Sequence, residues 1–389
     1  MEKYARRVKS FGQSSIDVMT AIALEQDCIM LAGGTPGFDA PEGLVRTAEK
    51  FLRKGHNQYT VNRGGKRLRR AIAEKWCSSI GREIDPETEI TITCGATEAL
   101  LDCALALLDI KDKAIIFEPF YENFRSISLL AGAQPVPVPL LPPSWEPDMD
   151  ALEKAAVGAK ALIINSPHNP TGAVFSEDAL RRIAEIAVRE DLFVISDETY
   201  RTMVFDGVEP KSIASLPGMA ERTAVVSSFS KTMTITGWRV GFFIASPAMT
   251  SQIRKAHDFA SICAPAPFQD AIAEYWFTED FEEYFDSLMA DYRKKSEVLS
   301  SALINSGFEV TPPRGAYYIL ADFSDLFPEI DDLDFCRIMA RDVGVSAVGG
   351  RAFFSDADRA RRYARFAFAQ PMSIIEKAAE RIRAYFDKR

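Results

Sequence analysis

The feature that most constrains this chain is a repeated alternation of short β-rich runs with amphipathic helical stretches. The β-rich runs cover residues 89–94, 114–117, 134–138, 161–164, 192–196, 223–228 and 240–244. Between them, segments such as 176–188 carry apolar residues at three-to-four spacing, behind a Ser176 that suits a helix N-cap. This alternation predicts an α/β architecture, with a mostly parallel seven-stranded sheet covered by helices.

The pattern changes near Thr278, where one long helical stretch begins. It spans about 279–306 and is followed by Gly307, a residue typical of helix ends. The remainder has its own candidate elements, strands at 315–321 and 363–369 and helices at 332–343 and 374–386. We therefore expect a second, smaller α+β domain in the C-terminal third.

Charge and cysteine content exclude several classes of partner and site. The net charge of -9, from 46 basic and 55 acidic residues, gives no electrostatic reason to expect nucleic acid or an anionic membrane. The 6 cysteines lack a CxxC pair and the 3 histidines lack ligand spacing, so neither a disulfide framework nor a metal site is expected. No apolar segment approaches the roughly 20 residues of a membrane span, and no secretory signal is evident. We expect a cytoplasmic protein.

Polar, aromatic and ionisable residues follow the carboxyl ends of the expected strands, where ligands bind in open α/β sheets. In chain order they are Gly95, Ala96 and Thr97; Tyr121; Asn165 and Asn169; Asp197 and Tyr200; and Ser228 and Lys231. The first four groups have plain structural explanations as well: a capped turn, a loop-holding aromatic, a proline turn and, for Asp197, a salt bridge or helix cap. Their convergence on one edge favours a binding site.

Lys231 is the most informative of these residues. An apolar strand precedes it, and Arg239 follows within the run TGWRVGFF. Taken alone, a lysine is usually a solvated surface residue. An ammonium among apolar neighbours and beside another cation has a lowered pKa, which suits a nucleophile.

Taken together, these motifs resemble the class I and II aminotransferases, fold-type-I enzymes that depend on pyridoxal phosphate (PLP), in the kynurenine, aromatic and aspartate-type branches. The motifs are GAT, PFY, NSPHNPTG, SDETY, SSFSKT, TGWRVG and RFAFA, and the likeness spans nearly the whole chain. It implies a large PLP-binding domain over 45–280 and a small domain of 1–44 with 281–389, joined by the long helix. It also implies a homodimer with shared active sites.

The resemblance implies roles for individual residues. Lys231 would hold PLP as a Schiff base and carry the proton between Cα and the cofactor. Asp197 would pair with the pyridinium nitrogen, and Tyr200 and Asn169 with the phenolate oxygen. Tyr121 would stack on the ring. The phosphate would bind a set formed by Gly95, Ala96, Thr97, Ser228, Arg239 and, from the partner subunit, Tyr59.

For the substrate, the resemblance places the α-carboxylate on Arg365, with Gly34 and Asn165 completing that site. Two departures limit the substrate class. The segment HDFASICAPAPFQDA lacks the arginine that receives a distal carboxylate in the aspartate-specific branch, and Ala96-Thr97 stands where the bacterial aspartate type has lysine. These departures favour a neutral amino donor, aromatic or kynurenine-like. Arg254 or Arg63 could still bind an acidic substrate if the loops place them inward. The side-chain pocket depends on the segment 10–22 and on Tyr317 and Tyr318.

We therefore expect an aminotransferase that moves the amino group of an L-amino acid to a 2-oxo acid such as 2-oxoglutarate by a ping-pong reaction. Two alternatives share the cofactor residues: an aspartate-type aminotransferase and a C–S β-lyase. A more distant one is a non-catalytic ligand-sensing protein of this fold.

Overall fold

The computed structural model describes residues 4–9, 11, 14–205, 207 and 210–388. Within that part, strands form an eight-stranded and a four-stranded sheet. The larger contains β1 (Ile90–Thr93), β2 (Lys113–Glu118), β3 (Gln134–Leu141), β4 (Glu146–Pro147), β5 (Ala161–Asn165), β6 (Phe193–Asp197), β7 (Thr223–Ser228) and β8 (Gly241–Ile244). The smaller contains β9 (Glu309–Val310), β10 (Tyr318–Asp322), β11 (Val348–Gly349) and β12 (Tyr363–Ala367).

The larger sheet has the strand order β1-β8-β7-β6-β5-β2-β3-β4. β2, β3, β5, β6 and β7 pair in parallel, while β8 is antiparallel to β1 and β7, and β4 to β3. The seven expected strands are all present, each within a few residues of its expected bounds, which confirms the α/β class. The additional strand β4 has only 2 residues.

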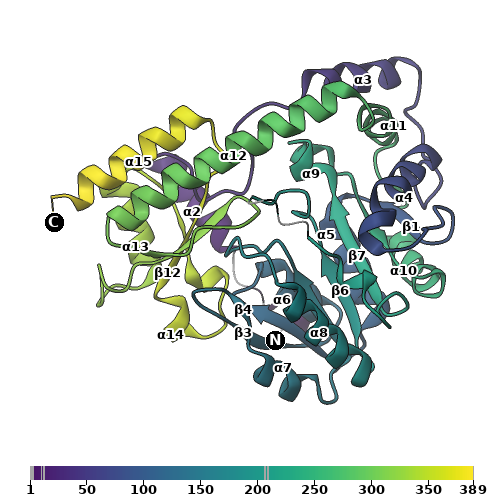
Figure 1. Cartoon of the computed structure of the whole chain (residues 1–389), viewed down its shortest axis with the longest axis horizontal. Coiled ribbons are helices and arrows are strands. Elements are labelled where there is room, and N and C mark those ends of the chain that lie inside the picture. Colours follow the sequence, from purple (N-terminus) through teal and green to yellow (C-terminus); the bar gives the residue numbers. More distant parts are fainter. Residues whose placement is uncertain (1–3, 10, 12–13, 206, 208–209, 389) are drawn as a thin grey trace.

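Helices cover both faces of the larger sheet (Figure 1). The helices that precede the small sheet are α1 (Arg6–Lys9), α2 (Ser15–Glu25), α3 (Glu42–Arg53), α4 (Lys66–Ile80), α5 (Gly95–Leu107), α6 (Glu122–Leu130), α7 (Met149–Ala156), α8 (Glu177–Arg189), α9 (Phe229–Thr232), α10 (Pro247–Ala260), α11 (Ala266–Tyr275) and α12 (Glu279–Asn305). The last three are α13 (Asp332–Ile338), α14 (Ala357–Ala360) and α15 (Met372–Phe386). As expected, Ser176 caps α8, since its hydroxyl accepts a hydrogen bond from the Ala179 N–H at 3.1 Å.

Side-chain alternation along β2 shows why both faces need helices. Ile115 and Phe117 join the core beneath α7 and α8, whereas Ala114 and Ile116 join the core beneath α5, α6 and α10. Successive residues of a strand point to opposite faces, so a strand that is apolar at every position must be covered twice. The sheet is therefore buried, and its polar residues gather at its carboxyl edge.

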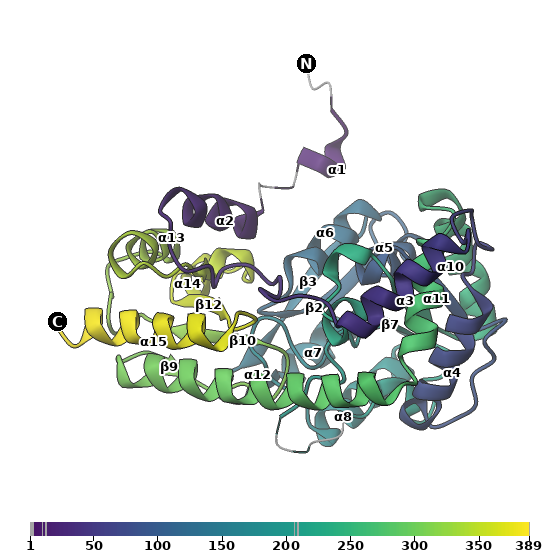
Figure 2. The ribbon, with the colours of Figure 1, turned by 90° about the horizontal axis from the view of Figure 1, so that it is seen from above.

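Helix α12 runs along both sheets and ends beside α15 at the small, all-antiparallel sheet (Figures 1 and 2). It begins behind a Thr278 cap and ends before Gly307, close to the expected bounds. The expected helix at 332–343 is instead α13 followed by a π-helical turn, Met339–Val343. The segment after α2 packs against the small sheet, because the carbonyl oxygen of Leu31 accepts a hydrogen bond from the N–H of Ala367, in β12, at 2.7 Å.

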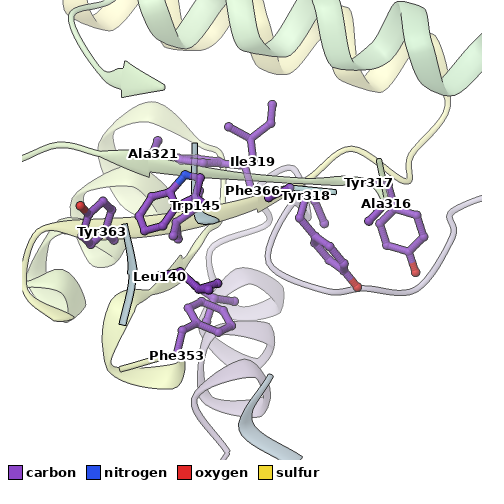
Figure 3. Close-up of a cluster of buried hydrophobic side chains, with 14 of the residues drawn as sticks. Leu140, Trp145, Ala316, Tyr317, Tyr318, Ile319, Ala321, Phe353, Tyr363 and Phe366 are labelled. Atoms are coloured by element: carbon purple, nitrogen blue, oxygen red, sulfur yellow. The ribbon is translucent and has the colours of Figure 1, made fainter. Parts of the chain in front are cut away.

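Aromatic packing joins the two sheets. Figure 3 shows Leu140 of β3 and the nearby Trp145 beside Phe353 and Tyr363. Tyr363 belongs to β12 of the small sheet, and Phe353 lies in the segment between β11 and β12. The ring centroids of Trp145 and Tyr363 are 5.6 Å apart in an edge-to-face arrangement. Tyr363 pairs with Asp322 at the end of β10, so this contact holds that end of the small sheet beside the large one. No described helix has the length and apolar content of a membrane-spanning segment.

Candidate active site

A cavity of about 270 Å³ lies at the carboxyl edge of the larger sheet. Most of the residues expected to bind cofactor or substrate line it together: Gly34, Ala96, Thr97, Tyr121, Asn165, Asn169, Asp197, Tyr200, Ser228, Lys231, Arg239 and Arg365. They come from both sheets and from segments far apart in the chain. Parallel strands deliver them because their carboxyl ends meet at one edge.

Lys231 lies in the short helix α9, directly after β7, and its half-buried side chain lines the cavity. Its Nζ donates to the carbonyl oxygen of Gly34 at 2.9 Å and lies 5.5 Å from the ring centroid of Tyr317. Burial first, and then the nearby cations Arg365 and Arg239, lower its pKa to about 7, against the pull of Asp197. A large share of this amine is therefore unprotonated, and nucleophilic, at neutral pH.

Asp197 ends β6 with its side chain buried at the cavity. The Thr199 N–H donates to its Oδ1 at 3.0 Å, and burial raises the pKa of the carboxyl to about 6. Asn165, at the end of the neighbouring strand, donates from Nδ2 to the Asp197 carbonyl at 2.9 Å, and its Oδ1 accepts from the Asn169 N–H at 2.8 Å. The Asn165 amide thus fixes the loops that carry Asp197 and Asn169.

Three tyrosines form one wall of the cavity region. The hydroxyls of Tyr200 and Tyr318 are 2.8 Å apart, and the Tyr317 hydroxyl donates to the carbonyl of Gly34 at 2.7 Å. Burial raises the pKa of Tyr200 well above its ordinary value, so its hydroxyl keeps its proton and can donate it in a hydrogen bond. Across the cavity, Tyr121 presents an aromatic side chain and has a pKa raised to about 12, again by burial.

Arg365 in β12 is the only charged residue of its strand and is 1% exposed. Its Nη1 donates to Asn169 Oδ1 at 3.0 Å and its Nη2 to the Ala32 carbonyl at 2.9 Å. Its Nε has no partner, and no carboxylate forms an ion pair with it among the described residues. A buried guanidinium without a counterion is costly unless an anion binds.

The turn from β1 into α5 forms a tight cradle with Arg239. Gly95 has a φ of +78°, and a Cβ there would lie 2.4 Å from Arg239 Nη2. A Cβ on Gly241 would lie 2.6 Å from the Ala96 nitrogen. Arg239 itself is held by the Thr236 carbonyl at 2.9 Å. The backbone N–H groups that begin α5 and one cation thus converge on a spot that suits a phosphate.

Several residues considered from the sequence lie elsewhere. Tyr59 is 79% exposed and does not line the cavity of its own chain. Arg254 is held by Thr91 Oγ1 at 2.8 Å, and Arg63 pairs with Glu87 at 3.0 Å, so neither faces the cavity. Arg254 and Arg63 are thus unavailable to a substrate in their own chain.

The cavity is also lined by residues that the sequence did not single out: Ile16, Leu100, Thr199, Ser230 and Thr236. Ile16 belongs to the segment 10–22, of which residues 10, 12 and 13 lie outside the described part of the chain. Thr199 and Ser230 adjoin expected residues, so a search of every position flanking the strand ends would have included them. The sequence thus expected the segment 10–22 at the pocket without singling out Ile16, and nothing in the local sequence marks Leu100.

The known proteins that this chain resembles are aminotransferases. The model of the family described as aminotransferase class I and II matches residues 26–382. A probable N-succinyldiaminopimelate aminotransferase of Mycobacterium tuberculosis is 35% identical, with 97% of each chain covered. The methionine aminotransferase of Escherichia coli is 33% identical, again with 97% of each covered. The solved structure of the M. tuberculosis N-succinyldiaminopimelate aminotransferase superimposes with a TM-score of 0.93 at 36% identity, covering 98% of this chain and 99% of that one.

Proposed function

This chain belongs to the class I and II aminotransferases, and on that premise we propose that it binds PLP in the cavity at Lys231 and transfers the amino group of a neutral or aromatic L-amino acid. A kynurenine-like donor fits the same description. The observation that carries the proposal is the meeting of Lys231, Asp197 and Arg365 in one cavity. A poised amine, a buried carboxylate and a cation without a counterion have no structural need to share a site.

The residues present fit PLP. The cradle of Gly95, Ala96 and Arg239 suits its phosphate, since a side chain on Gly95 would collide with Arg239. Thr199 Oγ1 is buried without a partner beside the cavity, which leaves a donor for a ligand. Asp197 would meet the protonated ring nitrogen, and Tyr121 would stack on the ring face. Thr97, Ser228 and Tyr200 with Asn169 would complete the polar contacts.

When bound, PLP supplies an aldehyde that condenses with an amine and a ring that withdraws electrons from the substrate Cα. Lys231 would hold the cofactor and, once its amine is free, move the proton at Cα, for which a pKa near 7 is well matched. Asp197, buried and fixed by Thr199, would keep the ring nitrogen protonated. Tyr200 would donate its hydroxyl hydrogen to the ring oxygen, since its own ionisation is suppressed.

Arg365 would clasp the α-carboxylate of each substrate in turn. Its uncompensated charge and its fixed position over Tyr318 and Phe353 favour one carboxylate geometry. Gly34 would let Tyr318 keep its place at the substrate site, because a Cβ there would lie 2.6 Å from the Tyr318 hydroxyl. Ile16, Leu100 and Tyr121 around the cavity suit a neutral side chain. A 2-oxo acid such as 2-oxoglutarate would then accept the amino group in the second half of a ping-pong reaction.

We also propose a homodimer with shared sites. Apolar side chains stand exposed on one region: Tyr59 at 79%, Val61 at 54%, Phe259 at 93% and Ile262 at 51%. The two segments that carry them are joined by a 2.6 Å hydrogen bond from Asn62 Nδ2 to Asp258 Oδ1. Exposed aromatic residues grouped in this way indicate a protein interface, and a second copy covering them would let Tyr59 approach its partner's phosphate cradle.

The unpaired state of the six cysteines supports a reducing, cytoplasmic location. The separate small sheet supports a large domain over 45–280 and a small one formed by 1–44 and 281–389.

The test is to incubate the protein with PLP, reduce with borohydride and map the modified peptide. We expect the label on Lys231, and a label on another lysine would contradict the assignment. In a separate sample that has not been reduced, addition of amino acids one at a time should convert the bound cofactor to its pyridoxamine form. Release of ammonia and pyruvate in place of that conversion would favour the lyase.

A further inference from the structure

A buried charged cluster lies behind the phosphate cradle and takes no part in the chemistry above. His257 of α10 is fully buried between two carboxylates of α5. Its Nδ1 is 2.8 Å from Glu98 Oε1 and 3.5 Å from Asp102 Oδ2. Its Nε2 is 2.8 Å from the carbonyl oxygen of Asn62. The ring thus bridges a core helix and a surface segment.

Both ring nitrogens of His257 face oxygen atoms that accept hydrogen bonds. A carbonyl can only accept, so Nε2 must carry a hydrogen, and the Glu98 carboxylate likewise calls for one on Nδ1. The ring is therefore the imidazolium cation. The neighbouring carboxylates of Asp102 and Glu98 raise its pKa to about 10 despite burial. Glu98, Asp102 and His257 are also grouped closely enough to surround a metal ion, but an imidazolium offers no lone pair to a metal.

Glu98 connects this cation to the phosphate cradle. Besides His257, its carboxylate accepts hydrogen bonds from the Cys94 N–H and the Ser261 hydroxyl. Cys94 is the residue that precedes α5, and its carbonyl oxygen accepts from Arg239 Nη2 at 3.4 Å. One residue of the cradle turn is thus held by Glu98 through its N–H and by Arg239 through its carbonyl.

Asn62 connects the same cation to the exposed face. It follows Val61 and stands close to Tyr59, two of the exposed apolar residues at the face where a second copy would bind. Its side chain donates to Asp258 at 2.6 Å, and the carbonyl of Arg63 accepts from the Ile92 N–H of β1 at 3.1 Å. The segment 59–63 is therefore tied to β1 and α10, the elements that border the cradle.

We propose that His257 is a positioning residue that links the phosphate cradle to segment 59–63, so that phosphate binding and association of two copies strengthen each other. The path runs from Cys94 through Glu98 and His257 to Asn62. The central link is the buried ion pair between His257 and Glu98. Its loss would leave the Glu98 carboxylate without its cation and would loosen the turn that forms the cradle. The inference rests on the proposed PLP site and homodimer, and it adds the residue that couples them.

The test compares His257→Gln with His56→Gln as a matched control. His56 makes the same kind of contact, Nδ1 to Asp270 Oδ2 at 2.7 Å, but on the surface, with its side chain 45% exposed and with no contact to the cradle. For each protein, sedimentation measures the dissociation constant of the dimer with PLP, with pyridoxal and without cofactor. Fluorescence titration measures the affinity for each cofactor.

In the wild type and His56→Gln, PLP should tighten the dimer about tenfold or more, within the usual range of coupling between sites. In His257→Gln this effect should fall below about threefold, and the Kd for PLP should rise about tenfold, as for the loss of a charged hydrogen bond. Affinity for pyridoxal, which lacks the phosphate, should be unchanged. A general loss of stability would weaken both cofactors alike, and that result, or wild-type coupling in His257→Gln, would overturn the proposal.

Circular dichroism shows whether His257→Gln folds. If it does not, Glu98→Gln replaces it, since an amide oxygen can still accept from Cys94 while the charge opposite His257 is removed. Failure of the proposed function looks different: borohydride would label another lysine, or the wild type would remain monomeric at every concentration. A wild type that labels at Lys231 and dimerises without any response to PLP would overturn this inference alone.

Discussion

The guanidinium of Arg365 lies over the ring of Tyr318, 4.4 Å from its centroid, and no carboxylate in the described part of the chain pairs with it. The ring and the Asn169 and Ala32 oxygens hold the side chain in place but leave its charge uncompensated. Burial without a counterion destabilises the folded chain unless a ligand supplies one. The position is thus prepared for a carboxylate.

Replacing Arg365 with alanine should raise KM for every amino acid while PLP stays bound. Losing one partner of a buried charge pair costs about 2–5 kcal/mol, which corresponds to at least about 30-fold in kcat/KM. Steady-state kinetics and the absorbance of the bound cofactor measure the two effects. Arg362→Ala is the control, since Arg362 pairs with Asp322 at the surface. Equal kinetics in the two variants would remove Arg365 from the substrate site.

The amine of Lys231 should titrate near pH 7 in the cofactor-free protein. Its neutral form alone reacts with acetic anhydride, so the labelling rate of its peptide, followed by mass spectrometry, reports the pKa. Replacing Arg365 with methionine removes a nearby cation that disfavours the protonated form. The midpoint should therefore move to higher pH. A midpoint near 10.4, the ordinary value of lysine, in the unmodified protein would show that the amine is solvated.

Lys231 should also lower the stability of the cofactor-free protein. Its pKa is about 7 in the folded chain and near lysine's ordinary value of about 10.4 when unfolded. Between these values the unfolded chain binds one more proton, so this group makes the free energy of unfolding rise with pH. Lys231→Met should remove that slope. The stability difference, variant minus wild type, should fall by about 1.4 kcal/mol per pH unit from pH 8 to 10 in urea unfolding. A difference independent of pH would contradict the lowered pKa.

The residues at strand ends could be predicted from the sequence, because two local features locate them: an apolar strand and the polar residue that directly follows it. Apolar period and length define a strand such as β6, and a polar residue directly after it, Asp197, must reach the carboxyl edge. The same reasoning located Asn165 and Lys231. The strands β4, β9 and β11 were missed because 2 residues show no period.

Contacts that depend on packing between the two sheets had no local signal. The sequence assigned the segment 10–22 and Tyr318 to the side-chain pocket, but no local pattern showed that Ile16 of α2 lines the cavity or that Tyr318 meets Tyr200 across 118 positions of sequence. Asn165 lines the cavity, as expected, and its amide also bonds the backbone of Asp197 and Asn169, which the sequence did not indicate. Hydrogen-bond partners of this kind follow from the register of neighbouring strands, β5 beside β6, which is set by the whole sheet.

Gly34 and Tyr318 should behave as a matched pair. A Cβ on Gly34 would lie 2.6 Å from the Tyr318 hydroxyl oxygen but 3.5 Å from the ring carbon that carries it, an ordinary contact. Gly34→Ala should therefore displace Tyr318 from the hydroxyl of Tyr200 and move the Gly34 carbonyl that holds Lys231 at 2.9 Å. We expect kcat/KM to fall about tenfold or more, as for the loss of about 1.4 kcal/mol.

Tyr318→Phe removes the oxygen that the new methyl group meets, so the double variant Gly34→Ala/Tyr318→Phe should recover most of the activity lost in Gly34→Ala. The Tyr318→Phe variant alone is the reference, because it loses the hydrogen bond to Tyr200 without any collision. A double-mutant cycle in kcat/KM measures the coupling between the two sites, which should be positive and at least about 1 kcal/mol for side chains in direct contact. Additive losses would mean that the methyl group of Gly34→Ala lowers activity by obstructing the substrate and not by colliding with the Tyr318 hydroxyl.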